Sequence, residues 1–485
     1  MINYSKAKRI KYNGLIYRCL LSAIIMLLLS SCGQGNNNKT YTISGRITSA
    51  GSSMAGVTVI LAGDTSMSTT TDVAGNYTFT GVPGGTFTVT PFLAGSPFRP
   101  LFRMAFLNGI DGTGFDFFVH GLGRLAMATH AMYVKDDGTV LAWGNNNNGQ
   151  LGDGSTTTRY NPVTVSGLSG MKSVAAGSGH TVALKNDGTI WAWGNNSNGQ
   201  LGDGTLDSRT TPVQVSLLTG MTAVAAGYGH TVALKNDGTV WAWGNNDSGQ
   251  LGDGSSTSTN IPVPVAGLSS ITAVAAGAYH TVVLKSDGTV WSWGKNSNGQ
   301  LGNGNITASN VPVQVKGLSG VSSGIVTAVA AGYDHTVILR NDGTVWSWGN
   351  NSNGQLGNGN ITASNAPVQV SGLSTVTAIA AGFGHSLALK SDGTVWTWGN
   401  NSRGQLGNGL TNGVTIDSAI PVLVSNLPSV VDIAGGYEGS VALKGLLRGD
   451  GTLWLWGSNS NGQLGNGLVN ATMIYSAIPV QALLP

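Results

Sequence analysis

The sequence predicts an all-β protein built around a seven-bladed β-propeller, with a small β-sandwich before it. The main observation is a Trp-Gly dipeptide that recurs at intervals of 50, 50, 50, 55, 50 and 58 residues. Its tryptophans are Trp143, Trp193, Trp243, Trp293, Trp348, Trp398 and Trp456. An Asp-Gly pair precedes each of them, and the chain holds 74 glycines but only 9% charged residues. Repeats of this length are typical of propellers, in which each repeat forms one blade.

One repeat divides into four short strands separated by turns. The strands expected in the third repeat are Val224–Gly227, His230–Leu234, Val240–Gly244 and Pro262–Val265. The first of these consists of small residues, which suits the crowded edge beside a propeller axis. Asp237 and Gly238 predict a hairpin turn, because Asp-Gly supplies the positive φ that tight turns need. Four strands per repeat correspond to one blade.

Residues 1–31 resemble a bacterial lipoprotein signal peptide. Five basic residues precede an apolar run from Leu20 to Leu29, which is short for a mature membrane span. Leu29-Ser30-Ser31-Cys32 resembles a lipobox, so Cys32 is the expected lipidation site and residues 32–40 a tether. An ordinary signal peptide with a chance cysteine is the alternative. Gly33 favours the outer membrane or the cell surface over the inner membrane.

The charge of the chain changes when this signal segment is removed. Lys+Arg then falls from 24 to 19 against 21 Asp+Glu, which leaves a net charge of −2. A basic footprint for nucleic acid is therefore not expected. Cys19 lies within the signal segment, so the mature chain has no cysteine other than Cys32 and no disulfide is expected.

Residues 41–119 predict a β-sandwich of short alternating strands. Period-2 alternation places Tyr77, Phe79, Phe87 and Val89 on buried faces. The D-x-x-G-x-Y-x-F and V-P-x-G-x-F-x-V strings resemble the carboxypeptidase regulatory-like family, whose fold is a transthyretin-like β-sandwich. That family implies an accessory module and contributes no catalytic residue.

Residues 120–485 resemble the regulator-of-chromosome-condensation repeat family. The resemblance rests on the A-A-G-x-x-H-T, D-G-T-V-W-x-W-G and N-G-Q-L-G strings, and it implies a seven-bladed propeller. We expect the C-terminal strand Pro479–Leu483 to complete the ring against residues 124–128. The nucleotide-exchange role of the eukaryotic member is not expected, because this chain has an envelope signal and no basic tail. A small GTPase is therefore not an expected partner.

Most residues that suggest chemistry have a structural explanation. One histidine recurs in six repeats, as His130, His180, His230, His280, His335 and His385. Equivalent positions on successive blades are spread around a ring, so we expect each histidine to bond backbone in its own blade and hold no metal. The Asn-rich loops, such as residues 245–254, carry too few carboxylates for Ca²⁺ and indicate turn chemistry. No cofactor motif or catalytic constellation is evident.

The candidate recognition residues lie in the turn before each repeated histidine. This turn and the Gln-Leu-Gly loop should emerge on one face of the propeller. The two turn residues between the glycine and the histidine vary most sharply between repeats. The partner-binding candidates are Tyr228, Tyr279, Tyr333, Asp334, Phe383, Tyr437 and Glu438. Aromatic residues on an otherwise small-residue surface are typical of recognition. The alternative is that these rings pack between blades and vary by drift.

Two function classes follow from this organisation. The first is a non-catalytic binding or scaffold module, lipid-anchored in the cell envelope, which holds another protein or a glycan through one propeller face. The second is an envelope hydrolase that acts on glycan or peptide in the central channel. A hydrolase would need carboxylates or histidines near the axis, and the inner strands read Val-Ala-Ala-Gly. The first class is therefore favoured.

Overall fold

The computed structural model contains β-strands as its only regular elements within the residues that it describes. These residues are 39–49, 52–92, 98–99, 103–107, 110–113, 117–119, 123–318, 325–409, 416–427, 430–436, 439–444, 452–468 and 474–485. The all-β prediction is confirmed for them. The predicted signal segment 1–31 and Cys32 lie outside this set. In the part of the chain that is described, no helix is long and apolar enough to cross a membrane.

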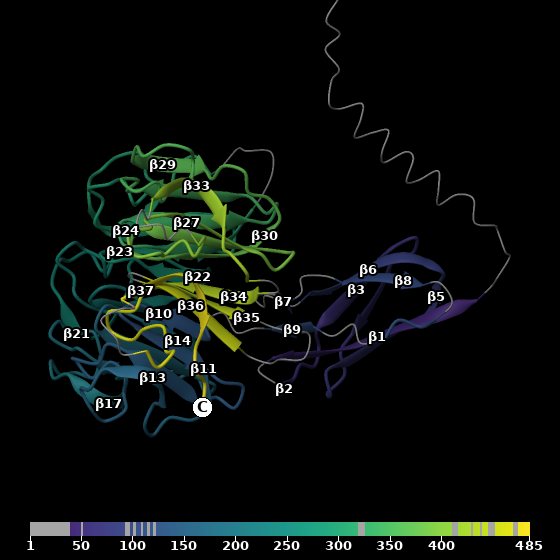
Figure 1. Cartoon of the computed structure of the whole chain (residues 1–485), viewed down its shortest axis with the longest axis horizontal. Coiled ribbons are helices and arrows are strands. Elements are labelled where there is room, and N and C mark those ends of the chain that lie inside the picture. The colour runs from purple at the N-terminus through teal and green to yellow at the C-terminus, as the bar shows by residue number, and fades with distance from the viewer. Residues whose placement is uncertain are drawn as a thin grey trace, which may run out of the picture.

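The first strands form two sheets of their own, which Figure 1 shows gathered apart from the rest of the fold. One sheet has the order β2-β1-β9-β7, with β5 paired to β1, and the other has the order β4-β3-β6-β8. The bounds are β1 Thr40–Ser49, β2 Ser52–Ser53, β3 Thr58–Gly63, β4 Met67–Thr70, β5 Asn76–Pro83, β6 Gly85–Phe92, β7 Phe98–Arg99, β8 Arg103–Leu107 and β9 Phe117–Val119.

One hydrophobic core joins these two sheets. Tyr77 and Phe79 come from β5, whereas Phe87 and Val89 come from β6 in the other sheet, and all four are buried in the same cluster. The burial predicted from their period-2 alternation is confirmed. Because successive side chains of a strand point to opposite faces, each sheet turns one apolar face toward the other.

From residue 123 onward, the described strands form seven consecutive sheets of four strands each. The first four sheets, in chain order, comprise β10 Leu125–Met127, β11 His130–Val134, β12 Val140–Gly144 and β13 Arg159–Thr164; β14 Met171–Ala176, β15 His180–Lys185, β16 Ile190–Gly194 and β17 Arg209–Gln214; β18 Met221–Ala226, β19 His230–Lys235, β20 Val240–Gly244 and β21 Thr259–Pro264; β22 Ile271–Ala276, β23 His280–Lys285, β24 Val290–Gly294 and β25 Ser309–Gln314. The four strands expected in the third repeat are confirmed by β18 to β21.

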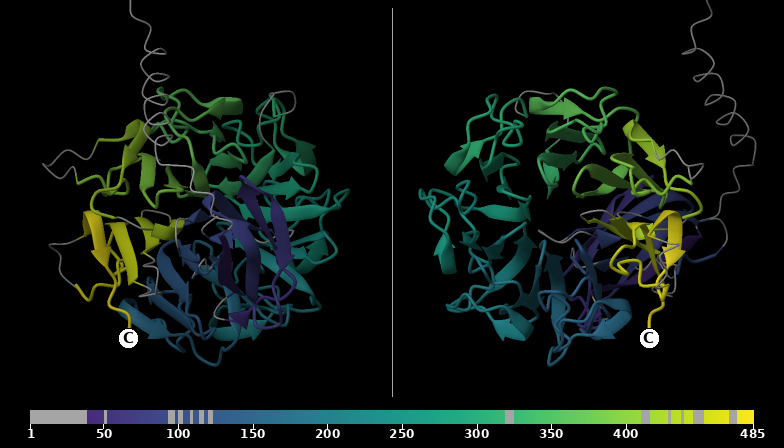
Figure 2. Two further views of the ribbon diagram at one scale, coloured as in Figure 1. Left: turned by 90° about the vertical axis from the view of Figure 1, so that its right-hand side faces the viewer. Right: turned by 60° about the vertical axis from the view of Figure 1, so that its left-hand side comes forward.

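The remaining three sheets repeat the same order. They comprise β26 Val326–Ala331, β27 His335–Arg340, β28 Val345–Gly349 and β29 Ser364–Gln369; β30 Val376–Ala381, β31 His385–Lys390, β32 Val395–Gly399 and β33 Ser418–Leu423; β34 Val430–Gly435, β35 Gly439–Lys444, β36 Thr452–Ser458 and β37 Tyr475–Gln481. Figure 2 shows these sheets arranged in a ring, with the first and last sheets side by side. The inner strands contact one another from sheet to sheet, and β10 contacts β34. This arrangement is a β-propeller.

The ring is closed by side chains and not by a shared strand. The C-terminal strand β37 pairs with β36 of its own sheet, so it forms no sheet with residues 124–128. The contact expected there is made by side chains, since Ala482 shares a core with Leu125 and Met127. Each sheet is a continuous run of four strands and needs no strand from elsewhere. Leu125 and Trp143 of the first sheet instead share a core with Leu455 and Leu464 of the last. The Trp143 indole also donates to the Gln463 carbonyl at 2.9 Å.

The same tryptophan bond joins the other neighbouring sheets. The second tryptophan of each Trp-x-Trp-Gly strand is fully buried. Its indole nitrogen donates to a glutamine carbonyl of the preceding sheet. Trp243 donates to Gln200 at 3.0 Å, for example. A Cβ on Gly202 would lie 2.6 Å from this indole nitrogen, and Gly202 has a φ of +68°. The glycine of the Gln-Leu-Gly string therefore allows the tryptophan to approach the loop.

The sequence led us to expect that each repeated histidine bonds backbone in its own blade, and for five of the six this expectation is wrong. The Nε2 atoms of His130, His180, His230, His280 and His335 instead meet a hydroxyl of the following sheet, at 2.7 to 3.2 Å. Each hydroxyl lies on the strand that follows the small-residue strand, where the inner edges of neighbouring sheets come close. The histidines therefore connect blades and hold them at a fixed spacing.

Candidate functional site

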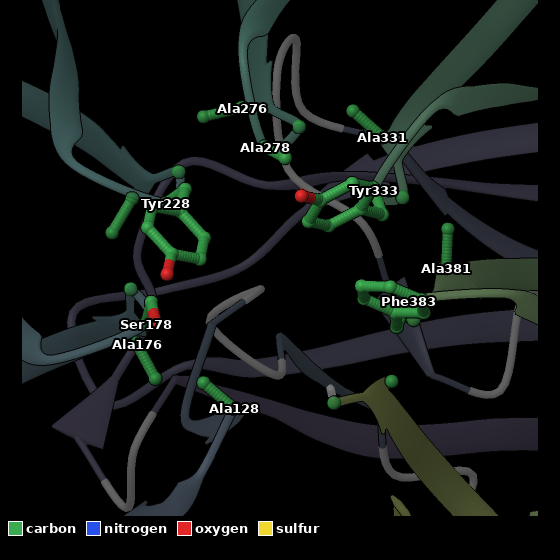
Figure 3. A pocket seen from close by; sticks show the side chains of 18 of the residues that line it. Ala128, Ala176, Ser178, Tyr228, Ala276, Ala278, Ala331, Tyr333, Ala381 and Phe383 are labelled. Carbon is green, nitrogen blue, oxygen red and sulfur yellow. The ribbon is translucent and has the colours of Figure 1, made fainter. Parts of the chain in front are cut away.

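The inner strands end around a pocket on the propeller axis. Figure 3 shows the small side chains that line it, among them Ala176, Ala276, Ala331 and Ala381. Glycine follows each of these alanines. A Cβ on Gly277, which follows Ala276, would collide with the His280 ring and lie 2.6 Å from the Gly332 carbonyl oxygen. The Ala-Ala-Gly string is thus required by the close approach of neighbouring inner strands.

The structure brings four of the predicted recognition residues together at the mouth of this pocket. The Tyr228 and Tyr279 rings are stacked with centroids 5.5 Å apart, and Tyr333 meets Tyr279 edge-on at 6.0 Å. Phe383 follows at 4.2 Å from Tyr333. Tyr228 and Phe383 are each 42% exposed, and Figure 3 shows both beside the opening. The rings therefore pack across neighbouring sheets and still leave aromatic surface open to solvent.

Two predicted site residues, Tyr437 and Glu438, lie outside the described residues. The remaining one, Asp334, is close to the aromatic rings but points into a hydrogen-bond network of the protein. Its carboxylate accepts from Lys295 at 3.1 Å, from Asn298 at 3.1 Å and from Gln300 at 2.8 Å. Asp334 therefore fastens the turn that carries Tyr333, because its oxygens are already engaged by the preceding sheet.

Lys295 is a site residue that the sequence analysis missed. Its ammonium lies 5.6 Å from the Tyr279 ring centroid and 6.0 Å from that of Tyr333, within reach of cation–π attraction. The other repeats carry Asn145, Asn195, Asn245, Asn350, Asn400 and Ser458 at this position. In most of those repeats the loop glutamine donates to that asparagine, as Gln200 does to Asn195 at 2.7 Å. Comparison of the loops, repeat by repeat, would have revealed this lysine.

The surroundings of Tyr279 raise the pKa of its hydroxyl to about 12. The largest cause is removal from water, and the hydrogen-bonded Tyr333 phenol and the nearby Asp334 carboxylate add to it. The Tyr279 phenol is therefore harder to ionise than a free tyrosine. Lys295 and Asp334 form an ion pair with each other, so the aromatic surface carries little unbalanced charge.

A second pocket opens beside the aromatic cluster, over the first three sheets. We call it the amide groove, and it is lined by Thr129, Asn145, Asn147, Asn148, Gln150, Ser178, Gly179, Asn195, Ser197, Asn198, Gln200, Tyr228 and Gly229. It shares Ser178 and Tyr228 with the axial pocket. The prediction that the turns before the histidines and the Gln-Leu-Gly loops share one face is confirmed by this lining.

Two glycines keep the amide groove open. Gly179 and Gly229 occupy the turn position that Tyr279 fills in the fourth sheet. A Cβ on Gly229 would meet nothing closer than 3.4 Å, so the backbone itself tolerates a side chain there. The groove therefore exists because these two turns lack the ring that Tyr279 provides in the next repeat.

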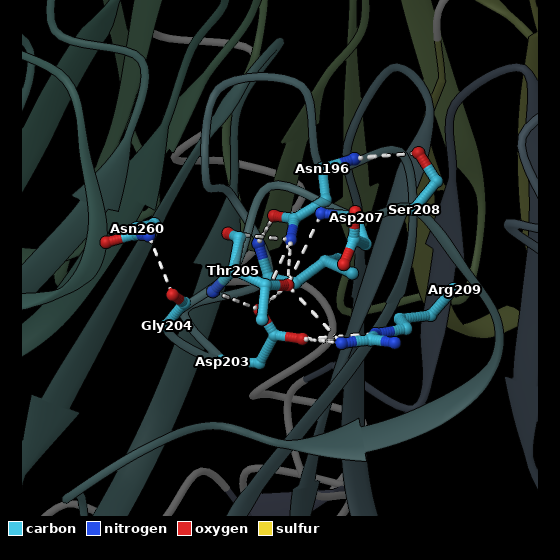
Figure 4. Close-up of polar contacts among 9 residues, drawn as sticks. Asn196, Asp203, Gly204, Thr205, Asp207, Ser208, Arg209 and Asn260 are labelled. Carbon is cyan, nitrogen blue, oxygen red and sulfur yellow. Dashed lines mark hydrogen bonds and ion pairs between the residues drawn. The ribbon is translucent and has the colours of Figure 1, made fainter.

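The Asn-rich loops are held by turn chemistry, as predicted. Figure 4 shows Asp203, which accepts from the Thr205 hydroxyl at 2.8 Å and pairs with Arg209 at 3.0 Å. Burial works against the charged form, but the bonds from Thr205 and Arg209 outweigh it and hold the pKa of Asp203 below its usual value. Asn303 replaces this aspartate in a later repeat and accepts from Asn296 at 3.3 Å. Across the residues described, no three His, Cys, Asp or Glu side chains are grouped as metal ligands would be.

Comparison with protein families identifies the repeats. The RCC1-like domain family matches residues 262–483, and the regulator of chromosome condensation (RCC1) repeat matches residues 137–184, 187–234 and 237–284. A second RCC1 repeat family matches residues 171–200 and 221–250. The repeat 187–234 starts at the turn before β16 and ends in β19, so each such repeat takes strands from two neighbouring sheets.

Solved structures resemble the propeller at low sequence identity. Human WBSCR16 is 26% identical, with a TM-score of 0.63, and the match covers 72% of this chain and 94% of that one. Yeast RCC1 (Prp20) bound to Kap60 is 23% identical with the same TM-score, over 74% of this chain and 85% of that one. Prp20p from Saccharomyces cerevisiae, described with its binding to Gsp1p and histones, is also 23% identical with a TM-score of 0.63, over 75% and 87%. The two yeast structures show the fold alone.

Proposed function

Because the chain carries RCC1 repeats in an RCC1-like propeller domain, we propose that it is a non-catalytic binding module that engages a partner through the axial face. We define this face as the aromatic cluster of Tyr228, Tyr279, Tyr333 and Phe383 together with the amide groove. The observation that carries the proposal is the exposed aromatic cluster on an otherwise small-residue surface. Aromatic residues are enriched at the energetic centres of interfaces.

The departure from repeat symmetry supports this proposal. The inner strands and the buried tryptophans are nearly the same in every sheet, since the blades have to pack alike. The aromatic rings, Lys295 and Asp334 break this regularity on one side of the axis. They give the face a polar side and an apolar side, so a partner can bind it in one orientation in preference to others.

The lining of the axial pocket favours binding over hydrolysis. The described residues that line it are alanine, glycine, serine, methionine and the aromatic residues. A hydrolase would need a pair of carboxylates or an activated nucleophile at this place. Turnover of a glycan or peptide by the purified chain would favour the alternative, an envelope hydrolase.

We propose that the module lies in the cell envelope. Residues 1–31 serve as a lipoprotein signal peptide, Cys32 carries the lipid, and residues 32–40 tether the chain to the outer membrane or the cell surface. The two N-terminal sheets form a carboxypeptidase regulatory-like sandwich, and the seven later sheets form the blades of one closed ring. Gsp1p and histones are partners of yeast Prp20p; a small GTPase is not expected for this chain.

A co-purification experiment tests the face. We replace Tyr228, Tyr279, Tyr333 and Phe383 with Ser in the full chain, cross-link intact cells and recover the protein with whatever it holds. A matched control replaces four apolar residues of the outer strands that are 41 to 52% exposed, Ile261, Val311, Ile420 and Ile478. The proposal requires loss of the partner only with the first set. Equal recovery from both variants would place the contact elsewhere.

The lipid anchor is tested separately. Metabolic labelling with a fatty acid should mark the wild-type chain and leave Cys32→Ser unlabelled. The variant should also move from the membrane fraction to the soluble fraction. A Cys32→Ser chain that still fractionates with membranes and still carries label would rule out lipidation at this cysteine.

A further inference from the structure

We propose that the amide groove and the adjoining Tyr228 ring form a binding site for a neutral oligosaccharide. This inference rests on the proposed function, because it names the class of ligand that the axial face takes. The groove is a different part of that face from the Tyr333 and Phe383 rings. The two can therefore be tested with different variants.

The chemistry of the groove is that of uncharged hydrogen bonding. Every residue that lines it is neutral, and nearly all of them offer an amide or a hydroxyl. A side-chain amide carries two donor hydrogens and an acceptor oxygen in one plane. Such a group can bond two neighbouring hydroxyls of a sugar ring, each of which is both donor and acceptor. A surface of this kind suits a ligand that presents hydroxyls on many sides.

The amides are held in place before any ligand arrives. Gln150 Nε2 donates to Asn145 Oδ1 at 2.7 Å, and Gln200 Nε2 donates to Asn195 Oδ1 at 2.7 Å in the next sheet. The backbone of Asn148 is fixed by the Gln150 side chain at 2.9 Å. Groups that are already ordered lose little entropy when a ligand binds, so weak individual bonds can add up to a useful affinity.

Tyr228 supplies the apolar surface that a sugar ring also needs. It lies at the junction of the groove and the axial pocket, is 42% exposed, and is stacked on Tyr279 at 5.5 Å. One face of a pyranose ring consists of C–H groups and packs against an aromatic ring, while its hydroxyls point outward in the plane. An aromatic platform beside fixed amides matches both parts of such a ligand.

The charges favour a neutral sugar over other macromolecules. Nucleic acids and acidic polysaccharides need lysines or arginines at the contact, whereas the nearby Lys295 is paired with Asp334. The centre of a protein interface is usually a desolvated apolar pocket, and the groove is lined by amides. A neutral oligosaccharide is the class of partner that fits the residues present.

Isothermal titration calorimetry on the detergent-solubilised full chain tests this inference. The probes are neutral hexasaccharides of β-1,4-glucose, α-1,4-glucose and N-acetylglucosamine, with polygalacturonate as the acidic comparison. Gly229→Tyr fills the groove with the residue that Tyr279 provides in the next repeat. Gly384→Tyr makes the same change at the equivalent turn outside the groove, where a Cβ also meets nothing closer than 3.4 Å. Circular dichroism checks that both variants keep the wild-type fold.

We expect at least one neutral hexasaccharide to bind saturably. Gly229→Tyr and Tyr228→Ala should each weaken it by a factor of about 10 or more, which corresponds to about 1.4 kcal/mol. Gly384→Tyr should change the affinity by less than about threefold, which corresponds to about 0.6 kcal/mol. Binding only to polygalacturonate, or sugar binding that Gly229→Tyr leaves unchanged, would overturn the inference.

The result can be separated from that of the co-purification experiment. If no neutral hexasaccharide binds while the four-residue Ser variant still loses a cross-linked partner, the saccharide inference is wrong and the binding face stands. If hexasaccharides fail to bind and the four-residue Ser variant recovers as much partner as the wild-type chain, both proposals fail.

Discussion

His230 Nε2 lies 3.2 Å from Thr281 Oγ1 of the neighbouring sheet, and Thr281 Oγ1 in turn lies 2.8 Å from the Gln250 carbonyl oxygen. Since a carbonyl can only accept, the threonine hydroxyl donates to it, and the imidazole must donate to the threonine through Nε2–H. The Trp293 indole donates to the same carbonyl at 2.9 Å. The Gln250 carbonyl of the third sheet thus accepts two hydrogen bonds from the fourth sheet, one from the Thr281 hydroxyl and one from the Trp293 indole. The same Thr281 hydroxyl accepts a hydrogen bond from His230.

Thr281→Val should lower the stability of the propeller more than Thr281→Ser does. Valine keeps the shape of threonine but leaves the buried His230 donor without an acceptor, which costs about 1–3 kcal/mol. Serine keeps the hydroxyl and loses one methyl group, worth about 0.8 kcal/mol. Ser386 already plays this part beside His335 at 3.0 Å. Thermal unfolding of the two variants decides the matter, and a valine variant as stable as the serine variant would assign the site to packing alone.

Acid should destabilise the propeller well before its carboxylates titrate. Burial lowers the pKa of His130, His230, His280 and His335 to about 3 and that of His180 to about 4. The unfolded chain, in which the histidine pKa is about 6.5, binds protons first, so stability falls as the pH drops below that value. Between its unfolded and folded pKa values, each such histidine lowers the free energy of unfolding by about 1.4 kcal/mol for every pH unit of acidification.

A second loss of stability should follow at lower pH. The Thr239 hydroxyl and backbone N–H bonds lower the pKa of Asp237 to about 2, and Asp187 and Asp287 are lowered in the same way by Thr189 and Thr289. These carboxylates stabilise the fold above the unfolded value near 3.8 and lose that effect below it. Urea unfolding from pH 7 to pH 3 should show the histidine decline from about pH 6.5. A midpoint that stays constant down to pH 4 would contradict the burial of neutral imidazoles.

Gly277→Ala should disturb the ring at its narrowest part. The added methyl group would collide with the His280 ring and lie 2.6 Å from the Gly332 carbonyl of the next sheet. Overpacking of this kind costs about 1–3 kcal/mol. Gly229→Ala is the matched control, since its methyl group would meet nothing closer than 3.4 Å. Comparable melting temperatures for the two alanine variants would mean that the inner strands can separate.

Lys295 and Asp334 should behave as a coupled pair. Lys295→Asn leaves the carboxylate without its cation, and Asp334→Gly leaves the lysine and Gln300 without their acceptor. The double variant restores the residues of the second and third repeats, in which glutamine bonds the loop asparagine. We expect the double variant to lose less stability than the two single variants lose together. The difference, which is the coupling free energy, should be about 0.5–3 kcal/mol. Strict additivity in a thermal double-mutant cycle would show that the two residues act independently.

Much of the fold follows from local pattern. The four strands of each repeat, the Asp-Gly turns and the buried Tyr77, Phe79, Phe87 and Val89 could be predicted, because alternation and turn chemistry act over a few neighbouring residues. The Gly277 position could be assigned to the inner edge for the same reason. The candidate face could also be located, since the turns of a four-stranded blade alternate between its two ends.

The contacts between blades depended on how the ring is assembled. The partner of His230 is 51 residues away on another sheet, and the partner of Lys295 is 39 residues away. The spacing, tilt and order of the sheets decide which side chains meet across such distances, and no local pattern encodes them. For this reason the histidines were assigned to the wrong partners. Lys295 could have been found as a departure from the repeated loop asparagine, but its contact with Asp334 could not. The pattern of the chain sets what each blade is made of, whereas the packing of blades around the axis decides which residues meet to form the candidate site.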